Sequence, residues 1–146
     1  MTYIFQRSIV IHASPEQVYD ELLDIEAHKE WGDMTEVELL FSGPAQVGSR
    51  WRSVGAVANR VMRDECTIIE LDRPHAFGFQ SQSRSQNGLN TYTFFYRLEP
   101  VPEGTRVTFS REFGESDLKL PFVIRVLLSV PGFVPLMDRL IVAKIA

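Results

Sequence analysis

Alternation of apolar and polar residues with a period of two runs through most of the chain between residues 36 and 113. This period is typical of β-strands that bury one face and expose the other. Residues 3–12 also read as a strand, because they are rich in β-branched and aromatic side chains. The predicted strands are 3–12, 36–43, 49–55, 58–71, 75–83, 89–100 and 105–113.

A helical pattern separates the first two strands. Ser14 is a natural N-cap, Pro15 suits the first helical position, and Gln17 completes a capping box. Three apolar residues recur at helical spacing and give this helix one apolar face: Val18, Leu22 and Ile25. A second short helix is predicted at 25–30 and is expected to end near Trp31.

The chain after about residue 117 is predicted to be a long helix that contains the apolar stretch PFVIRVLLSVPGFVPLM, residues 121–137. A membrane span needs roughly 20 apolar residues, and Arg125 and three prolines interrupt this stretch, so no transmembrane span is expected. Pro131–Gly132 should bend or interrupt the helix. We therefore expect a two-part helix whose first half, residues 118–130, moves as a lid, with Arg125 turned to solvent.

The predicted order is one strand, two helices, six strands and a long helix. Short connections between successive strands imply antiparallel hairpins, and a curved sheet could bury one face against the last helix. No linker or internal repeat divides the sequence. Residues 1–146 are thus predicted to form a single α+β domain.

Charge and cysteine content narrow the partners and the compartment. The formal net charge is −4 and no basic stripe is present, which argues against nucleic acid as a partner. Cys66 is the only cysteine, so no internal disulfide can form, and the chain suits a reducing cytosol. The first residues lack a signal-peptide pattern, and a cytoplasmic location is expected. The sequence leaves a homodimer open.

The alternation in residues 89–100 places four side chains on one face that should point inward: Tyr92, Phe94, Tyr96 and Leu98. Asn87–Gly88 is a strong hairpin signal, because both residues tolerate positive φ. A turn centred there predicts the pairs Ser81–Phe94, Phe79–Tyr96 and Ser83–Tyr92. Phe77, Phe79, Ser81 and Ser83 should then point inward as well.

The two neighbouring hairpins extend this inner face. Pairing Leu98 with Thr105 places Phe94 opposite Phe109 and Tyr92 opposite Arg111, so that Arg111 points inward between Phe109 and Phe113. On the other side, the turn at 72–75 predicts the pairs Ile68–Phe79, Cys66–Ser81 and Asp64–Ser83. Met62 and Trp51 join the same face by parity, unless a bulge reverses it.

The predicted inner face is apolar at one end and polar at the other. The apolar end has Phe77, Phe79, Tyr96 and Val107, and the polar end has Asp64, Ser83, Tyr92 and Arg111. Apolar walls with a few convergent polar groups are common in ligand pockets. A structural interpretation stands beside this one, in which Asp64 and Arg111 form an ion pair at the rim of the sheet with Tyr92 in support.

Candidate ligand-binding residues are taken from this face and from the apolar side of the last helix: Trp51, Met62, Phe79, Ser81, Ser83, Tyr92, Phe94, Phe109, Arg111, Phe122, Val126, Phe133 and Met137. The aromatic members have a plain alternative, which is that they only form the core. No cofactor or metal is expected, because the sequence lacks the common phosphate, hydrolase and zinc motifs. His12, His28 and His75 are far apart, and Cys66 is predicted to be a small buried apolar residue.

Two motifs carry a resemblance to a known superfamily: A-S-P-E-x-V before a helix that ends near a tryptophan, and L-E-P-x-x-x-G-T-R-V. Through them, essentially the whole chain resembles the START-like (SRPBCC) superfamily, and most of all its polyketide cyclase/dehydrase and lipid-transport branch. The resemblance implies a helix-grip fold, in which a seven-stranded antiparallel sheet wraps a long C-terminal helix and leaves a cavity between them. Members bind lipids, sterols, polyketides or other hydrophobic molecules. They share no universal catalytic motif, so no residue is carried over as catalytic. The break at Pro131–Gly132 and the end at Ala146 depart from the pattern of relatives, whose last helix usually continues as a charged tail.

Three functions are compatible with the sequence. The sequence favours a binding or carrier protein for a hydrophobic small molecule over an enzyme. The alternative is a polyketide cyclase or dehydratase, in which Tyr92 donates a proton, Arg111 stabilises an enolate and Asp64 acts as a base. The third is a protein-interaction module, in which an exposed apolar part of the last helix contacts a partner.

Overall fold

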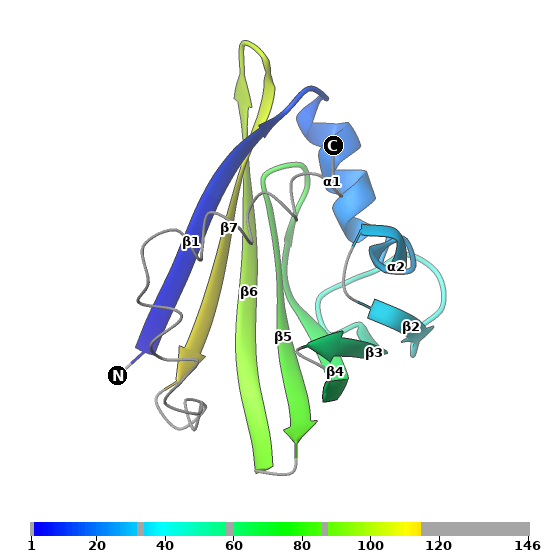
Figure 1. Ribbon diagram of the computed structural model, residues 1–146. Coiled ribbons are helices and arrows are strands. Elements are labelled where there is room, and N and C mark those ends of the chain that lie inside the picture. The colour runs from blue at the N-terminus through cyan, green and yellow to red at the C-terminus, as the bar shows by residue number, and fades with distance from the viewer. Residues whose placement is uncertain (1, 32–33, 58–59, 86–87, 115–146) are drawn as a thin grey trace.

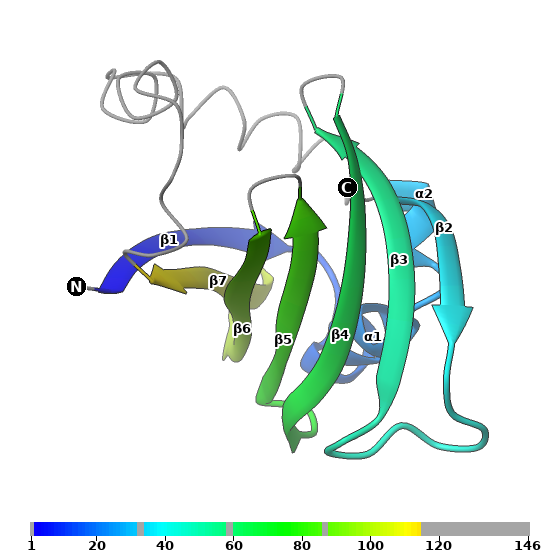
Figure 2. The same ribbon diagram turned by 90° about the horizontal axis from the view of Figure 1, so that it is seen from below.

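The computed structural model describes residues 2–31, 34–57, 60–85 and 88–114, which form one curved sheet and two short helices (Figure 1). The elements are β1 (Thr2–Ile11), α1 (Pro15–Leu23), α2 (His28–Trp31), β2 (Met34–Leu39), β3 (Arg50–Val57), β4 (Arg60–Asp72), β5 (Ala76–Ser85), β6 (Gly88–Val101) and β7 (Gly104–Gly114). All seven strands are antiparallel to their neighbours, in the order β1-β7-β6-β5-β4-β3-β2. Figure 2 shows the sheet curving from β1 at one edge to β2 at the other. The predicted α+β sheet and its strand order along the chain are confirmed.

The local signals at the start of α1 act as predicted. The Gln17 backbone N–H donates to Ser14 Oγ at 3.2 Å, and the Ser14 backbone N–H donates to Gln17 Oε1 at 3.1 Å, which completes the capping box. Pro15 is the first helical residue. The reciprocal bonds fix where the helix begins, and hence which of its faces meets the sheet.

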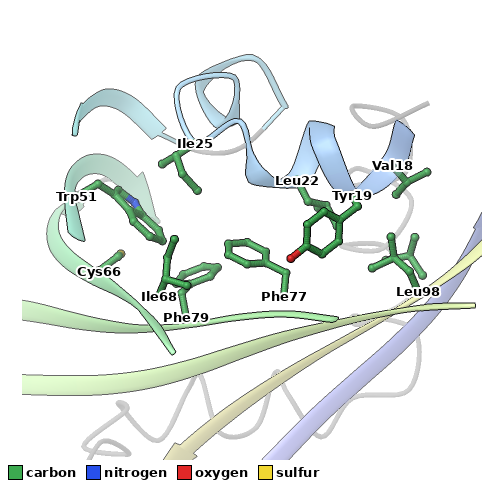
Figure 3. Close-up of a cluster of buried hydrophobic side chains, with 11 residues drawn as sticks. Val18, Tyr19, Leu22, Ile25, Trp51, Cys66, Ile68, Phe77, Phe79 and Leu98 are labelled. Carbon is green, nitrogen blue, oxygen red and sulfur yellow. The ribbon is translucent and has the colours of Figure 1, made fainter. Parts of the chain in front are cut away.

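Helix α1 covers one end of the concave face of the sheet (Figure 3). Its buried side chains, with Ile25 just beyond it, pack against residues of five strands: Val18, Tyr19, Leu22 and Ile25 against Trp51, Cys66, Ile68, Phe77, Phe79, Leu98 and Val107. Each aliphatic or aromatic side chain buried in this way contributes about 1.5–3 kcal/mol to folding. The concave face is therefore the core side of the sheet.

A buried histidine joins the two helices. His28 opens α2, three residues later than predicted, and its Nε2 lies 2.7 Å from the Leu22 carbonyl oxygen. Burial lowers the pKa of His28, and the bond to the Leu22 carbonyl and the charge of Asp24 partly oppose this effect. The neutral imidazole with a proton on Nε2 satisfies that carbonyl near the end of α1.

The register between β4 and β5 is confirmed at all three predicted pairs: Ile68–Phe79, Cys66–Ser81 and Asp64–Ser83. A bulge between Ile68 and Glu70 lies on the turn side of these pairs and leaves them in register. Trp51 pairs with Cys66 from β3, and so it also lies on the inner face, as parity predicts.

The register of the next two hairpins is shifted by two residues from the prediction. Phe79 pairs with Phe94, Ser81 with Tyr92, and Ser83 with Asn90. Phe94 pairs with Arg111, Tyr96 with Phe109, and Leu98 with Val107. The predicted pairs Ser81–Phe94, Phe79–Tyr96, Ser83–Tyr92, Leu98–Thr105, Phe94–Phe109 and Tyr92–Arg111 are therefore wrong.

Both errors in register arise at the turns that connect the paired strands. Ser85 pairs with Gly88, so Gly88 belongs to β6 and does not stand at the centre of the turn. Val101 pairs with Gly104, which leaves only two residues in the turn where three were predicted. A shift of two residues moves neighbours but keeps every side chain on its face, so the inner face was predicted correctly.

The convex face of the same strands is charged. Arg97 lies 3.0 Å from Glu70, Arg106 lies 3.5 Å from Glu99, and Arg50 contacts Glu65. These exposed pairs contribute little to stability, and they keep the outer surface polar.

The predicted C-terminal helix lies outside the described residues. This applies to its bend at Pro131–Gly132, to Arg125 and to the proposed lid over 118–130. Within the described residues, no helix is long and apolar enough to cross a membrane.

The β6–β7 turn is locked against the corner that follows β1. Thr105 is fully buried and its Oγ1 donates to the Ala13 carbonyl oxygen at 2.7 Å, while His12 Nδ1 lies 2.9 Å from the Glu103 carbonyl oxygen. Gly104 has φ +145°, and a Cβ there would collide with the Ile11 carbonyl oxygen. Only glycine fits at this position.

Gly104→Ala should lower the free energy of unfolding by roughly 3 kcal/mol, because it adds backbone strain and a collision with β1. Gly43→Ala is the matched control. Gly43 also has positive φ, at +77°, but has nothing within 4 Å of an added Cβ, so its loss should be only about 1 kcal/mol. Urea denaturation measures both values. Equal losses would show that the contact with Ile11 is unimportant.

Candidate functional site

The concave face beyond α1 is lined by aromatic rings from four strands. Their centroids are 4.8 Å apart for Phe79 and Phe94, 5.2 Å for Tyr96 and Phe109, and 5.1 Å for Trp51 and Phe79. Such distances are those of packed aromatic pairs, and the two Phe rings are stacked. The rings form one continuous apolar wall from β3 to β7.

The wall becomes polar toward the ends of the strands remote from α1. Asp64 and Ser83 face each other on β4 and β5, and Tyr92 and Arg111 follow on β6 and β7. Arg111 Cζ lies 4.4 Å from the centroid of the Tyr92 ring and 5.3 Å from that of Phe94. The polar group predicted from the sequence is thus assembled by the fold.

Burial dominates the electrostatics of this polar end. It raises the pKa of Asp64, against the opposing effects of the Ser83 hydroxyl and the charge of Arg111. It also lowers the pKa of Arg111, although Tyr92 and Asp64 favour the charged guanidinium. Asp64 and Arg111 attract each other, but this attraction offsets only part of the cost of desolvating each charge.

Polar atoms on this face that lie buried without a hydrogen-bond partner among the described residues include Nε1 of Trp51, Oγ of Ser83 and Oδ1 of Asp64. Trp51 and Ser83 are fully buried, and Asp64 is half-buried. A hollow of about 390 Å³ at this end of the sheet touches Ser53 and Asp64, but it is lined mostly by residues that alternate to the convex side, among them Arg52, Arg63 and Glu65. Buried polar atoms are nearly always satisfied by protein, water or ligand, so these atoms mark a place where a polar group can bind.

A second hollow, of about 260 Å³, lies between α1 and the segment around β2. It is lined by acidic and apolar side chains, among them Asp20, Asp24, Ile25, Leu39 and Phe41. It is separate from the polar end of the concave face. No cluster of His, Cys, Asp and Glu among the described residues could hold a metal ion.

The candidate residues that can be located lie on the concave face: Trp51, Met62, Asp64, Phe79, Ser81, Ser83, Tyr92, Phe94, Phe109 and Arg111. Their contact with a ligand stays a prediction. Phe122, Val126, Phe133 and Met137 lie outside the described residues.

Two residues of this region escaped the sequence analysis. Arg7 on β1 pairs with Phe109 on β7 and lies on the concave face. Its Cζ is 5.1 Å from the centroid of the Phe5 ring. The alternation in the sequence puts Arg7 on the same face as Phe5, Ile9 and Ile11. No prediction was made of which face of that strand points inward. Tyr19 of α1 is buried against the sheet, where a cover was expected only from the last helix.

Comparison with known families finds a match over residues 2–139 to the family described as polyketide cyclase / dehydrase and lipid transport. The chain belongs to this family. It is therefore a member of the START-like superfamily, as the sequence motifs indicated. A comparison with curated proteins gave no match.

Solved structures share the fold at low sequence identity. Ara h 8.0201 is 15% identical, with a TM-score of 0.70, and the match covers 99% of this chain and 95% of that one. The major latex-like protein 151 of Panax ginseng is 15% identical, with a TM-score of 0.68 and coverages of 99% and 95%. The Zhui aromatase/cyclase of Streptomyces sp. R1128 is 16% identical, with a TM-score of 0.65 and coverages of 78% and 68%. At these identities the likeness shows the fold alone.

Cys66 is buried on the concave face, as predicted, beside Ser53, Ser81 and Asp64. Burial raises the pKa of its thiol to about 12. A thiol-specific chromogenic disulfide at pH 8 should therefore react with the native protein at least about a thousandfold more slowly than with a free cysteine. The same reagent in denaturing urea is the control and should react at the ordinary rate. Rapid reaction of the native protein would contradict the burial of Cys66.

Proposed function

We propose that this protein binds and carries a hydrophobic small molecule on the concave face of its sheet. The observation that carries the proposal is the aromatic wall of Trp51, Phe79, Phe94, Tyr96 and Phe109, which ends in a group of convergent polar side chains. Large apolar sites with a few placed polar groups are the usual form of small-molecule sites.

Two further observations support this function. The buried atoms Trp51 Nε1 and Asp64 Oδ1 need a polar partner that the described residues do not supply. The family to which the chain belongs is described by lipid transport as well as by cyclase and dehydrase activity. A carrier needs only the wall and the polar end, with no catalytic group.

Adjacent aromatic residues of β6 provide a matched test. Phe94 faces the concave side and packs on Phe79, whereas Phe95 covers Gly78 on the convex side. With a neutral solvatochromic dye as probe, Phe94→Ala should weaken binding about tenfold, because an aromatic contact is lost, and Phe95→Ala should change it less than twofold.

Fluorescence titration measures the dye affinity, and native mass spectrometry of protein purified from cells shows any retained ligand. Thermal melting identifies the temperature at which both variants are folded. Equal effects of the two substitutions, or no dye binding by the wild type, would overturn the carrier proposal.

The assembled polar group also favours a second candidate, a polyketide cyclase or dehydratase. Tyr92 and Arg111 are in contact, and Asp64 lies within electrostatic reach of Arg111. A tyrosine that donates a proton and an arginine that stabilises an enolate would suit such a reaction, with Asp64 as base. One structure of similar fold is named an aromatase/cyclase.

For this second candidate, Tyr92→Phe should slow the cyclisation of a linear poly-β-ketone at least about a hundredfold, because the general acid is lost. Thr93→Val, which removes a hydroxyl from the convex side of the same strand, is the control and should keep the wild-type rate. Product formation is followed by chromatography, and dye affinity is measured in parallel. No turnover by the wild-type protein would remove this candidate and leave the carrier.

A further inference from the structure

Asp64 on β4 and Ser83 on β5 are direct partners on the concave face, at the polar end of the aromatic wall. Ser83 is fully buried and Asp64 is half-buried. Side chains of direct cross-strand partners are close neighbours, yet Ser83 Oγ and Asp64 Oδ1 both lie buried without a hydrogen-bond partner among the described residues. Two adjacent buried oxygens that do not satisfy each other need a third group between them.

Small side chains connect this pair to the aromatic wall. On β4 and β5, Cys66 and Ser81 are the next residues on the same face, and Phe79 lies two residues from Ser81. Four residues of strand separate Ser83 from Phe79, a distance of about 13 Å. An elongated ligand with its polar group at Ser83 can therefore rest its far end on Phe79 and on the Phe94 ring stacked there.

The chemistry of the two oxygens selects the polar group of the ligand. A carboxylate oxygen such as Asp64 Oδ1 only accepts hydrogen bonds, whereas the Ser83 hydroxyl donates one and can also accept. A ligand hydroxyl can donate to Asp64 and accept from Ser83, and so it satisfies both atoms at once. A ketone, an ether or a carboxylate cannot donate, and would leave Asp64 Oδ1 without a partner.

Charged groups fit this place less well than a hydroxyl. Burial raises the pKa of Asp64, which shows that charge is unfavourable here. A ligand carboxylate would be repelled by Asp64 whenever that residue is ionised. An ammonium group could donate to both oxygens, but the positive charge of Arg111 already acts on Asp64 and would repel a second cation. A neutral hydroxyl avoids both repulsions.

We propose that the ligand is a neutral, elongated hydrophobic alcohol or phenol, whose hydroxyl donates to Asp64 and accepts from Ser83. Its apolar body lies along Cys66 and Ser81 and ends on the ring of Phe79. The inference rests on the proposed carrier function, and it adds the chemical class of the ligand and the two residues that select it.

Two matched fluorescent probes test this class of ligand: trans-4-hydroxystilbene and trans-4-methoxystilbene. The oxygen of the methoxy compound can accept a hydrogen bond but cannot donate one. Both compounds are neutral at about pH 7.5, since a phenol ionises near pH 10. The wild type should bind the hydroxy compound about tenfold more tightly, because only this compound can donate to Asp64. Fluorescence titration measures both affinities.

Substitutions assign the direction of each hydrogen bond. Asp64→Leu keeps the approximate size of the side chain and should bring the two affinities within about twofold of each other. A preference caused only by the bulk of the methyl group would survive this substitution. Ser83→Ala should weaken both compounds about fivefold and keep the preference, because either ligand oxygen can accept from Ser83.

Gln82→Leu is the matched control. Gln82 is exposed on the convex side of β5, where it pairs with Glu65, so its loss should change neither affinity. The methoxy compound guards against loss through misfolding, because the Asp64 variant should still bind it.

The outcomes distinguish the two proposals. If the wild type binds both stilbenes equally well, water satisfies the two oxygens, the hydroxyl class is wrong and the carrier function stands. Tighter binding of a stilbene that carries an aminomethyl group would also overturn the neutral class. A preference that persists in Asp64→Leu would show that Asp64 does not select the ligand. If the neutral dye binds and the stilbenes do not, the class of ligand alone is rejected. If neither binds, both proposals are overturned.

Discussion

The hydrogen-bonded ladder between β4 and β5 decides which side chains meet on the concave face. It sets Asp64 against Ser83, Cys66 against Ser81 and Ile68 against Phe79, and thereby joins the polar end to the apolar wall. A slip of one residue in this ladder would turn the charged convex pairs inward and the aromatic rings outward. The arrangement of the candidate site therefore depends first on the register of these strands, and only then on any single side-chain contact.

Much of this arrangement could be predicted from the sequence, because the alternation of side chains between the two faces does not change when the register shifts by two residues. The capping box at Ser14 gave the start of α1, and the alternation in β4, β5 and β6 gave the inner face, including Asp64 and Arg111. The pairs across two hairpins were wrong, since a turn that is tighter or differently centred moves the register without changing the alternation.

The parts that escaped prediction depend on contacts that are distant in the sequence. Arg7 joins the concave face only because β1 pairs with β7, about a hundred residues away. Tyr19 is buried because the corner after β1 is held by Thr105 and places α1 over the sheet. Local patterns predict faces and caps, but not which strand closes the sheet or how far a helix extends over it.

The alternation of β6 has a consequence for how such proteins can diversify. Phe94 belongs to the interior, while the neighbouring Phe95 and Arg97 belong to the outer surface, where Arg97 pairs with Glu70. Mutations at alternate positions can therefore alter the shape and polarity of the interior while leaving the charged exterior intact. The interior can therefore vary in sequence while the polar outer surface is kept, which suits a scaffold whose structural neighbours share the fold at about 15% identity.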